Sequence, residues 1–205
     1  MKKTFTLIEL IMILLLIGII SSQSELRNNM SKIKLAKKQI ILHLKYTRYI
    51  AMIDNKFDNN DPLWFRKRWT VKFLNCNKNI GGLYYIIYSD INENGYISKV
   101  ETLQDPLTNK YIYSYQCKED TNLDKYTLIL LTKEYGIKNI KISCNSTQTI
   151  GGISFDINGY GYSKLSTKEY DKDKYRLNND CYIQLYDKKN NEEIITIDGI
   201  TGVIF

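Results

Sequence analysis

The segment from Asp90 to Glu101 has the residue types and the spacing of a calcium-binding loop. Oxygen-bearing residues stand at its first, third, fifth, seventh, ninth and twelfth positions: Asp90, Asn92, Asn94, Tyr96, Ser98 and Glu101. Tyr96 would bind through its backbone carbonyl, Ser98 directly or through water, and Glu101 with both carboxylate oxygens. Gly95 at the sixth position allows the sharp turn that such a loop needs. The pattern predicts a structural calcium ion and no other cofactor.

The composition of the loop also bears on its affinity and setting. Asn at the third and fifth positions lowers the ligand charge, so we expect weak binding suited to millimolar extracellular calcium. The residues before Asp90 are typical of a β-strand, which places the loop on a β scaffold rather than in an EF-hand helix pair. The alternative is an ordinary turn rich in Asn, Asp and Gly that has this spacing by chance.

The four cysteines, Cys76, Cys117, Cys144 and Cys181, are even in number and widely spaced. They contain no Cys-x-x-Cys pair, which argues against a zinc site and against thioredoxin-like chemistry. Disulfides are expected in an exported domain. Of the three possible pairings we favour Cys76 with Cys117 and Cys144 with Cys181, because each pair brackets neighbouring predicted strands. Four free buried thiols are the alternative.

The chain contains a single histidine, His43, which excludes multi-histidine metal sites. This residue falls in a predicted helix and has no identifiable orienting partner, so we expect no Cys–His nucleophile. A Gly-rich phosphate loop, a serine elbow and a carboxylate pair are also missing from the sequence. The sequence therefore predicts that the protein is not an enzyme.

The segment from Trp64 to Trp69 interleaves aromatic residues with Arg66, Lys67 and Arg68. This composition can stack bases and neutralise phosphates, so contact with DNA is one interpretation. The other is an edge strand whose aromatic side chains enter the core while the charges stay solvated. The net charge is +7, and loss of Lys2 and Lys3 with a cleaved leader would reduce it to +5, too modest to require a nucleic-acid partner.

Residues 5–20 form an apolar run in which Glu9 is the only charged residue, and Lys2 and Lys3 precede it. As a helix the run would be about 24 Å long, somewhat shorter than the roughly 30 Å hydrocarbon core of a bilayer. A carboxylate inside it costs about 2 to 3 kcal/mol or more, so Glu9 requires a partner or a function. A secretory signal peptide cleaved near Ser22 and a plain signal anchor are the alternatives.

The short basic leader followed by Phe-Thr-Leu-Ile-Glu-Leu at positions 5–10 resembles the N-terminal signature of type IV prepilins. The resemblance implies that prepilin peptidase cuts between Thr4 and Phe5 and methylates the new amino group of Phe5, with Thr4 in the place of the usual Gly. It also implies that Glu9 neutralises the Phe5 amine of a neighbouring subunit inside a filament of packed helices.

The C-terminal third resembles the GspH/FimT group of minor pilins. The matching features are a Phe-Asp turn that carries a glycine at 155–159, a strand at 181–185, and a last strand followed by Thr-Gly at 195–202. Each feature alone is a weak motif, since such turns occur in many β proteins. Their order behind a prepilin-like N-terminus gives them weight.

Apolar residues recur at helical spacing from Leu26 to Ala51, and no proline precedes Pro62. We therefore expect a leader at 1–4, one helix over 5–54 whose part 5–20 spans a membrane, and a β-rich globular domain over 55–205. The expected fold is α+β and pilin-like, with the long helix packed on an antiparallel sheet. Strands are expected near residues 69–74, 83–89, 110–116, 127–132, 137–143, 152–157, 181–187, 193–198 and 202–205, of which 127–132 fits a helix equally well.

The resemblance implies a minor pilin or pseudopilin, a subunit of a type IV pilus or a type II secretion filament. The expected partners are other pilin subunits, prepilin peptidase and an inner-membrane assembly platform. The expected location is the inner membrane, crossed once, with the C-terminal domain in the periplasm, and afterwards a periplasmic or cell-surface filament. A DNA-uptake minor pilin that binds DNA and an exported soluble protein with an ordinary signal peptide are the alternatives.

Overall fold

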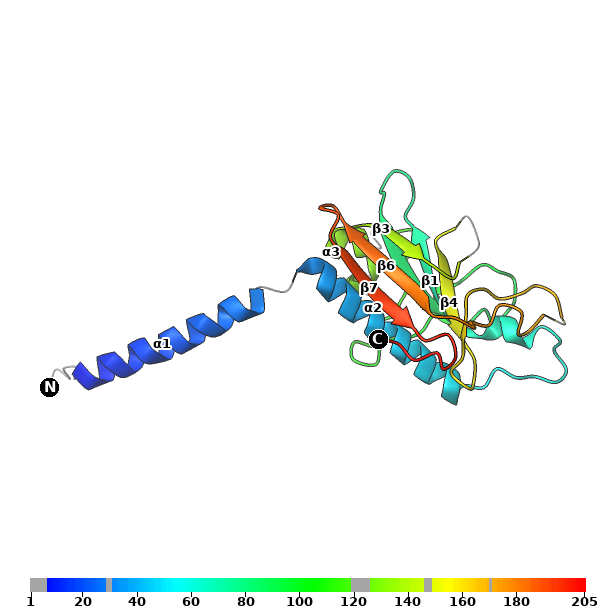
Figure 1. The fold of residues 1–205 in the computed structure, drawn as a ribbon, viewed down its shortest axis with the longest axis horizontal. Coiled ribbons are helices and arrows are strands. Elements are labelled where there is room, and N and C mark those ends of the chain that lie inside the picture. Colours follow the sequence, from blue (N-terminus) through cyan, green and yellow to red (C-terminus); the bar gives the residue numbers. More distant parts are fainter. Residues whose placement is uncertain (1–6, 29–30, 119–125, 146–148, 170) are drawn as a thin grey trace. The chain divides into compact units, whose positions relative to one another are not determined.

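The computed structural model describes residues 7–28, 31–118, 126–145, 149–169 and 171–205, with the backbone alone for 19–28. The chain divides into two compact units, Met1–Ser31 and Lys32–Phe205. The first contains helix α1, Leu7–Asn28. The second begins with helix α2, Lys32–Ile53, and continues into an α+β domain (Figure 1).

The single helix expected over residues 5–54 is wrong, because the chain forms two helices, one ending at Asn28 and the next beginning at Lys32. The sequence around the junction explains the division. Two asparagines, Asn28 and Asn29, are poor helix formers, and Ser31 stands directly before α2, where serine is a favoured N-cap. The apolar residues keep helical spacing on both sides of this boundary, so the hydrophobic pattern alone predicts one continuous helix.

The expected membrane-spanning segment over residues 5–20 is also wrong. Among the residues that the structure describes, no helix has the length and apolar character that a bilayer crossing requires. The apolar run stops at Ile20, and α1 continues through a polar segment that includes Glu25 and Arg27. The expected pilin-like fold with a long transmembrane helix, and the expected location in the inner membrane, periplasm or a surface filament, are corrected accordingly.

The second unit contains two antiparallel sheets. The first has the strand order β2-β1-β4-β5 and consists of β1 (Trp69–Asn75), β2 (Leu83–Tyr88), β4 (Gly151–Phe155) and β5 (Gly161–Tyr162). The second has the order β3-β6-β7 and consists of β3 (Ile137–Ile142), β6 (Cys181–Asp187) and β7 (Glu192–Ile197). In the first sheet, Val71 of β1 pairs with Ile87 of β2 and Ile153 of β4, which aligns an apolar row across three strands.

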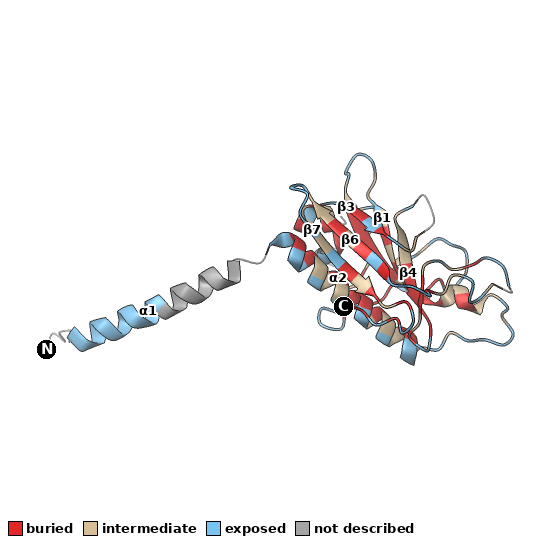
Figure 2. Cartoon of the chain, viewed as in Figure 1, coloured by how far each residue is buried: buried red, intermediate tan, exposed pale blue. Residues whose placement is uncertain are grey.

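Helix α2 packs against both sheets, touching β1 and β4 of the first and β6 and β7 of the second. Its buried side chains recur every three or four positions: Ile33, Ala36, Ile40, His43, Leu44, Thr47 and Ala51. This spacing places them on one face of the helix. Figure 2 shows buried residues along α2 and along the strands that it contacts. The core of the second unit therefore lies between α2 and the two sheets.

Two C-terminal turns meet on α2 at Arg48. The guanidinium donates from Nε to the carbonyl of Gly159 at 3.0 Å and from Nη2 to the carbonyl of Thr201 at 3.1 Å. Gly202 has a φ of +69°, and a Cβ there would collide with the Gly159 carbonyl oxygen. Only glycine fits this approach. The 155–159 and 195–202 segments that the sequence singled out thus lie side by side.

The regular elements match part of the expected strands. Strands near 69–74, 83–89, 137–143, 152–157, 181–187 and 193–198 are present as β1, β2, β3, β4, β6 and β7. Residues 127–132 instead contribute to the 3₁₀ helix η3 (Thr127–Ile129) and to helix α3 (Leu131–Tyr135). Residues 110–116 and 202–205 form only isolated bridges, of which Gln104–Tyr111 and Ile197–Ile204 are examples. The two remaining 3₁₀ helices are η1 (Trp64–Lys67) and η2 (Lys99–Glu101).

Both favoured disulfides are present. Cys76, just after β1, is bonded to Cys117, and Cys144, just after β3, is bonded to Cys181 at the start of β6. The bridged cysteines are 41 and 37 residues apart in the sequence. Each bond therefore ties a strand end to a distant part of the second unit.

Candidate functional site

The expected processing site, Thr4 and Phe5, lies outside the described residues. Glu9 is exposed in the first turn of α1, where the helix dipole favours a carboxylate. The apolar side chains around it are exposed as well, from Leu7 at 78% to Ile13 at 42%. Residues 7–18, whose side chains the structure describes in this helix, thus present an apolar helix surface that bears one carboxylate, Glu9.

The predicted calcium loop follows β2 and ends in the short helix η2. The side-chain oxygens at the third and fifth positions of the loop, Asn92 and Asn94, accept hydrogen bonds from the loop backbone. The amide of Asn94 donates to Asn92 Oδ1 at 3.0 Å, and the amide of Tyr96 donates to Asn94 Oδ1 at 2.7 Å. These two Asx turns keep both amide oxygens turned toward their own loop.

The carboxylates of the first and last residues of the loop, Asp90 and Glu101, accept hydrogen bonds from amides inside it. The amide of Gly95 donates to Asp90 Oδ2 at 3.1 Å, and the amide of Asn92 donates to Glu101 Oε1 at 3.4 Å. The other oxygen of Glu101 accepts from Ser98 twice, from its amide at 3.0 Å and its hydroxyl at 2.6 Å. The structure therefore brings all six predicted ligand residues into one hydrogen-bonded loop.

Both carboxylates are buried, with Asp90 6% and Glu101 5% exposed. Burial alone would raise the pKa of Glu101, but the hydrogen bonds from Ser98 and from backbone amides outweigh it and lower that pKa. Burial, reinforced by the charge of Asp90, raises the pKa of Tyr88 to about 12. Asp90 Oδ1 is buried and has no hydrogen-bond partner among the described residues.

The donor set of this loop is unlike that of a transition-metal site. Among the residues that the structure describes, no cluster of three or more His, Cys, Asp or Glu side chains is placed to hold a metal ion. The loop offers two carboxylates, and amide, hydroxyl and carbonyl oxygens would have to supply the remaining ligands. Oxygen ligands of this kind suit hard cations such as calcium.

The basic residues proposed for DNA contact have partners within the fold. Lys67 Nζ lies 2.6 Å from Asp61 Oδ2 and 3.0 Å from Glu93 Oε1. Arg66 donates to the carbonyl of Glu93 at 3.0 Å. These contacts hold the segment before β1 against the Asp90–Glu101 loop, so the geometry does not favour DNA contact.

Arg68 is the most buried of the three, at 4% exposure. Its guanidinium carbon lies 3.9 Å from the centre of the Tyr162 ring, and Nη1 donates to the carbonyl of Lys172 at 2.8 Å. The Tyr162 hydroxyl lies 3.0 Å from Asp156 Oδ2 and 2.9 Å from Asp173 Oδ1, and its single proton can be donated to either carboxylate. This cluster, which sequence reasoning missed, joins Arg68, directly before β1, and strand β5 to the segment before β6.

A second group that sequence reasoning missed surrounds His43. Its Nδ1 lies 2.7 Å from the hydroxyl of Tyr85, and its Nε2 lies 3.1 Å from that of Tyr126. Burial lowers the pKa of His43 to about 4, against the opposing charge of Asp105. The ring is neutral near pH 7, and its partners are tyrosines of the core. The only sequence signal for this network is the helical position of His43 on the apolar face of α2.

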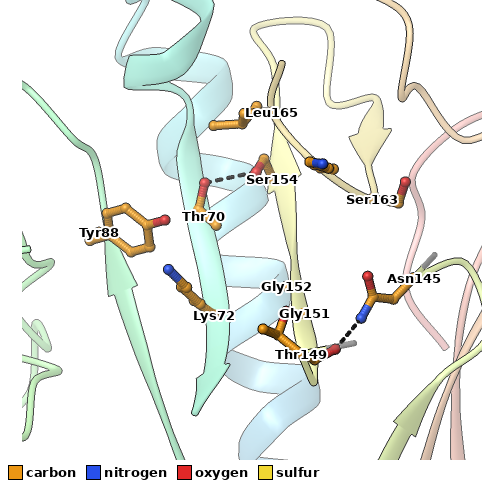
Figure 3. Close-up of a pocket in the computed structure, with 11 residues that line it drawn as sticks. Thr70, Lys72, Tyr88, Asn145, Thr149, Gly151, Gly152, Ser154, Ser163 and Leu165 are labelled. Atoms are coloured by element: carbon orange, nitrogen blue, oxygen red, sulfur yellow. Dashed lines mark hydrogen bonds between the residues drawn. The ribbon is translucent and has the colours of Figure 1, made fainter. Parts of the chain in front are cut away.

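The first sheet also carries a small pocket of about 240 Å³ on the side that faces away from α2 (Figure 3). Lys72 and Tyr88 border it on one side, and Asn145 lies at the other. Thr70 and Ser154 share a hydrogen bond of 2.7 Å across neighbouring strands. The described lining contains two lysines and no acidic or histidine side chain.

A scan against protein-family models found no matching family, and searches of curated proteins and of solved structures found no match.

Proposed function

We propose that the protein is a minor subunit of a filament of the type IV pilin class. In this proposal prepilin peptidase cuts between Thr4 and Phe5, and the processed chain assembles with other pilin subunits through its N-terminal helix. The observation that carries the proposal is α1, whose described apolar side chains are exposed and are interrupted by one carboxylate, Glu9.

The exposed apolar side chains of α1 are expected to be buried against another apolar surface. Matching apolar helices of other subunits would provide that surface. At roughly 25 cal/mol for each Å² of apolar surface buried, packing such helices together supplies a large driving force. Glu9 would oppose burial unless a positive charge accompanies it. The amino group that cleavage creates at Phe5 of a neighbouring subunit would provide that charge and fix the register between subunits.

The C-terminal turns give independent support. The 155–159 and 195–202 segments, which carry the resemblance to minor pilins, are far apart in sequence and are both held by Arg48 of α2. Motifs that arise by chance in unrelated hairpins have no reason to share one anchoring side chain. Their association therefore favours a common structural role.

The first test is the mature N-terminus. The protein would be isolated from cells that contain a prepilin peptidase and from cells that lack it, and its intact mass and first residue would be measured. We expect a chain that begins at N-methylated Phe5 only where the peptidase is present. A start near Gln23 in both strains would indicate an ordinary signal peptide and overturn the proposal.

The second test addresses assembly. A tagged chain would be purified with its partners, and partners that begin with N-methylphenylalanine would be counted by mass spectrometry. We expect Glu9→Gln to lose most of these partners, whereas Glu25→Gln, which removes the same charge later in α1, should retain them. Equal recovery with both variants would show that Glu9 has no role in assembly.

A further inference from the structure

We propose that the loop from Asp90 to Glu101 binds one calcium ion, which fixes the connection between β2 and η2. The inference goes beyond the filament function and does not depend on it. It rests on two separate observations. One is the arrangement of six oxygen-bearing residues in a single loop, and the other is a buried carboxylate oxygen that the described protein leaves without a partner.

The unpartnered oxygen is the stronger observation. Asp90 is 6% exposed, and the hydrogen bond from Gly95 to its Oδ2 shows that the carboxylate is turned into the loop. Leaving a buried charged oxygen unpaired is more costly than leaving a neutral polar group unpaired. A cation bound at Oδ1 would remove this cost, and Asp90 occupies the first ligand position of the loop.

The other predicted ligands are already turned toward the same loop. Glu101 holds both oxygens within it, through Asn92 on one side and Ser98 on the other. Ile97, between the ligand positions, packs against the core and anchors the loop to the domain. Little rearrangement is then needed before an ion can bind, which reduces the entropy that binding must overcome.

The ligand chemistry selects calcium over other common metals. Every candidate ligand is an oxygen, so zinc would lack the nitrogen and sulfur ligands that it prefers. Six ligand residues, with Glu101 able to bind through two oxygens, match the six to eight oxygens that calcium takes. Magnesium demands near-ideal octahedral geometry and keeps several waters, which a loop of this kind does not favour.

The charges around the loop predict weak binding. Only Asp90 and Glu101 are charged among the proposed ligands, and Arg66 Nη2 lies 3.9 Å from Asp90 Oδ2. The remaining acidic residue of the loop, Glu93, is paired with Lys67 at 3.0 Å. We therefore expect a Kd of about 10⁻⁴ to 10⁻³ M, the range of low-charge calcium modules.

The experiment uses the purified full-length chain after removal of metals with EDTA. Calcium and magnesium are titrated separately by calorimetry, and thermal unfolding is followed at increasing concentration of each ion. We expect one saturable calcium site, a rise in Tm with calcium, and a smaller effect of magnesium. Absence of saturable heat and of any Tm change up to about 10 mM calcium would show that the loop is a metal-free turn.

Two variants with the same charge change separate coordination from general electrostatics. Glu101→Gln removes a proposed ligand, and Glu93→Gln removes a carboxylate of the same loop that is not one. We expect the first to weaken calcium binding by at least about tenfold and the second by less than about threefold. Equal weakening by both would overturn the proposal, because it would make the effect one of net charge.

Glu101 also caps η2, so Glu101→Gln could weaken calcium binding by disturbing the fold of the loop. A third variant controls for this effect. Asn94→Asp keeps an oxygen that can accept from the amide of Tyr96 and adds a charge at the fifth ligand position. We expect it to bind calcium about three- to tenfold more tightly than the natural chain, because affinity rises with ligand charge. A misfolded loop cannot produce such a gain, and unchanged or weaker binding by a folded Asn94→Asp protein would count against coordination there.

Discussion

His43 should make the stability of the protein depend on pH between about 6.5 and 4. The residue is 4% exposed on the face of α2 that packs on the sheets, and both ring nitrogens have partners. The Gln39 amide nitrogen is a donor and lies 3.0 Å from Nε2, so in this orientation Nε2 accepts and the ring proton resides on Nδ1, facing Tyr85. Protonation of Nε2 would bring two donors together in a buried site.

The size and sign of the effect follow from the two pKa values. Burial lowers the pKa of His43 from 6.5 to about 4 in the folded protein. The unfolded chain therefore takes up the proton first as the pH falls, and stability that is fully present above about pH 6.5 is lost progressively down to about pH 4. At about 1.4 kcal/mol for each pH unit between the two pKa values, the loss approaches about 3 kcal/mol. That is a substantial part of the roughly 5 to 15 kcal/mol that stabilises a typical domain.

The measurement is urea unfolding of the full chain at a series of pH values, without calcium, for the natural protein and for His43→Gln. Glutamine can form hydrogen bonds but does not titrate, so the variant should be less stable at pH 7.5 and should lack the slope between pH 6.5 and 4. Carboxylates whose pKa is lowered, such as Glu101 and Asp187, also favour folding at higher pH, but both proteins contain them. Parallel curves for the two proteins over this range would refute the assignment to His43.

Four further variants test the packing of the second unit, each by urea unfolding. Ile40→Ala should cost about 2 to 5 kcal/mol because Ile40 is fully buried, whereas Leu42→Ala, at a position 57% exposed on the same helix, should cost less than about 1 kcal/mol. Replacing Cys144 and Cys181 together by serine should cost about 4 kcal/mol, since the bond closes a loop between residues 37 apart. Gly152→Ala should cost about 1 to 3 kcal/mol, because a Cβ there would lie 2.5 Å from a carbonyl oxygen of β1.

Strands with strong β-branched and aromatic character were predictable from the sequence. The alternation in Cys181–Asp187 places every second residue in the core, as a half-buried strand requires. The favoured disulfides followed from the same strands, because each cysteine pair brackets neighbouring ones. The alternation of apolar and polar residues within one strand shows which of its side chains face the core. No information from distant parts of the chain is needed for this prediction.

The failures have identifiable physical causes. The apolar segment 110–116 is not a strand, and the left-handed backbone at Gln116, with a φ of 52°, turns the chain away at its end. The break between α1 and α2 is marked only by asparagines and one serine, which a helical hydrophobic pattern outweighs. Strand β5 is two residues long, too short to show any periodicity.

In the candidate site, contacts between residues close in sequence were predictable, and contacts between residues far apart in sequence were not. Among the predicted calcium ligands from Asp90 to Glu101, the hydrogen bonds that stay within the loop join residues no more than nine positions apart, so a local motif could specify them. Arg68 instead finds its carbonyl partner 104 positions away, and His43 meets Tyr126 at a separation of 83. In the sequence, Arg66, Lys67 and Arg68 form one basic run, yet the fold gives Lys67 two carboxylates and buries Arg68 on an aromatic ring. A run of basic residues can form a binding surface only if the tertiary structure leaves it exposed. The contacts that decide this involve residues far away in the sequence, which a local sequence pattern does not identify.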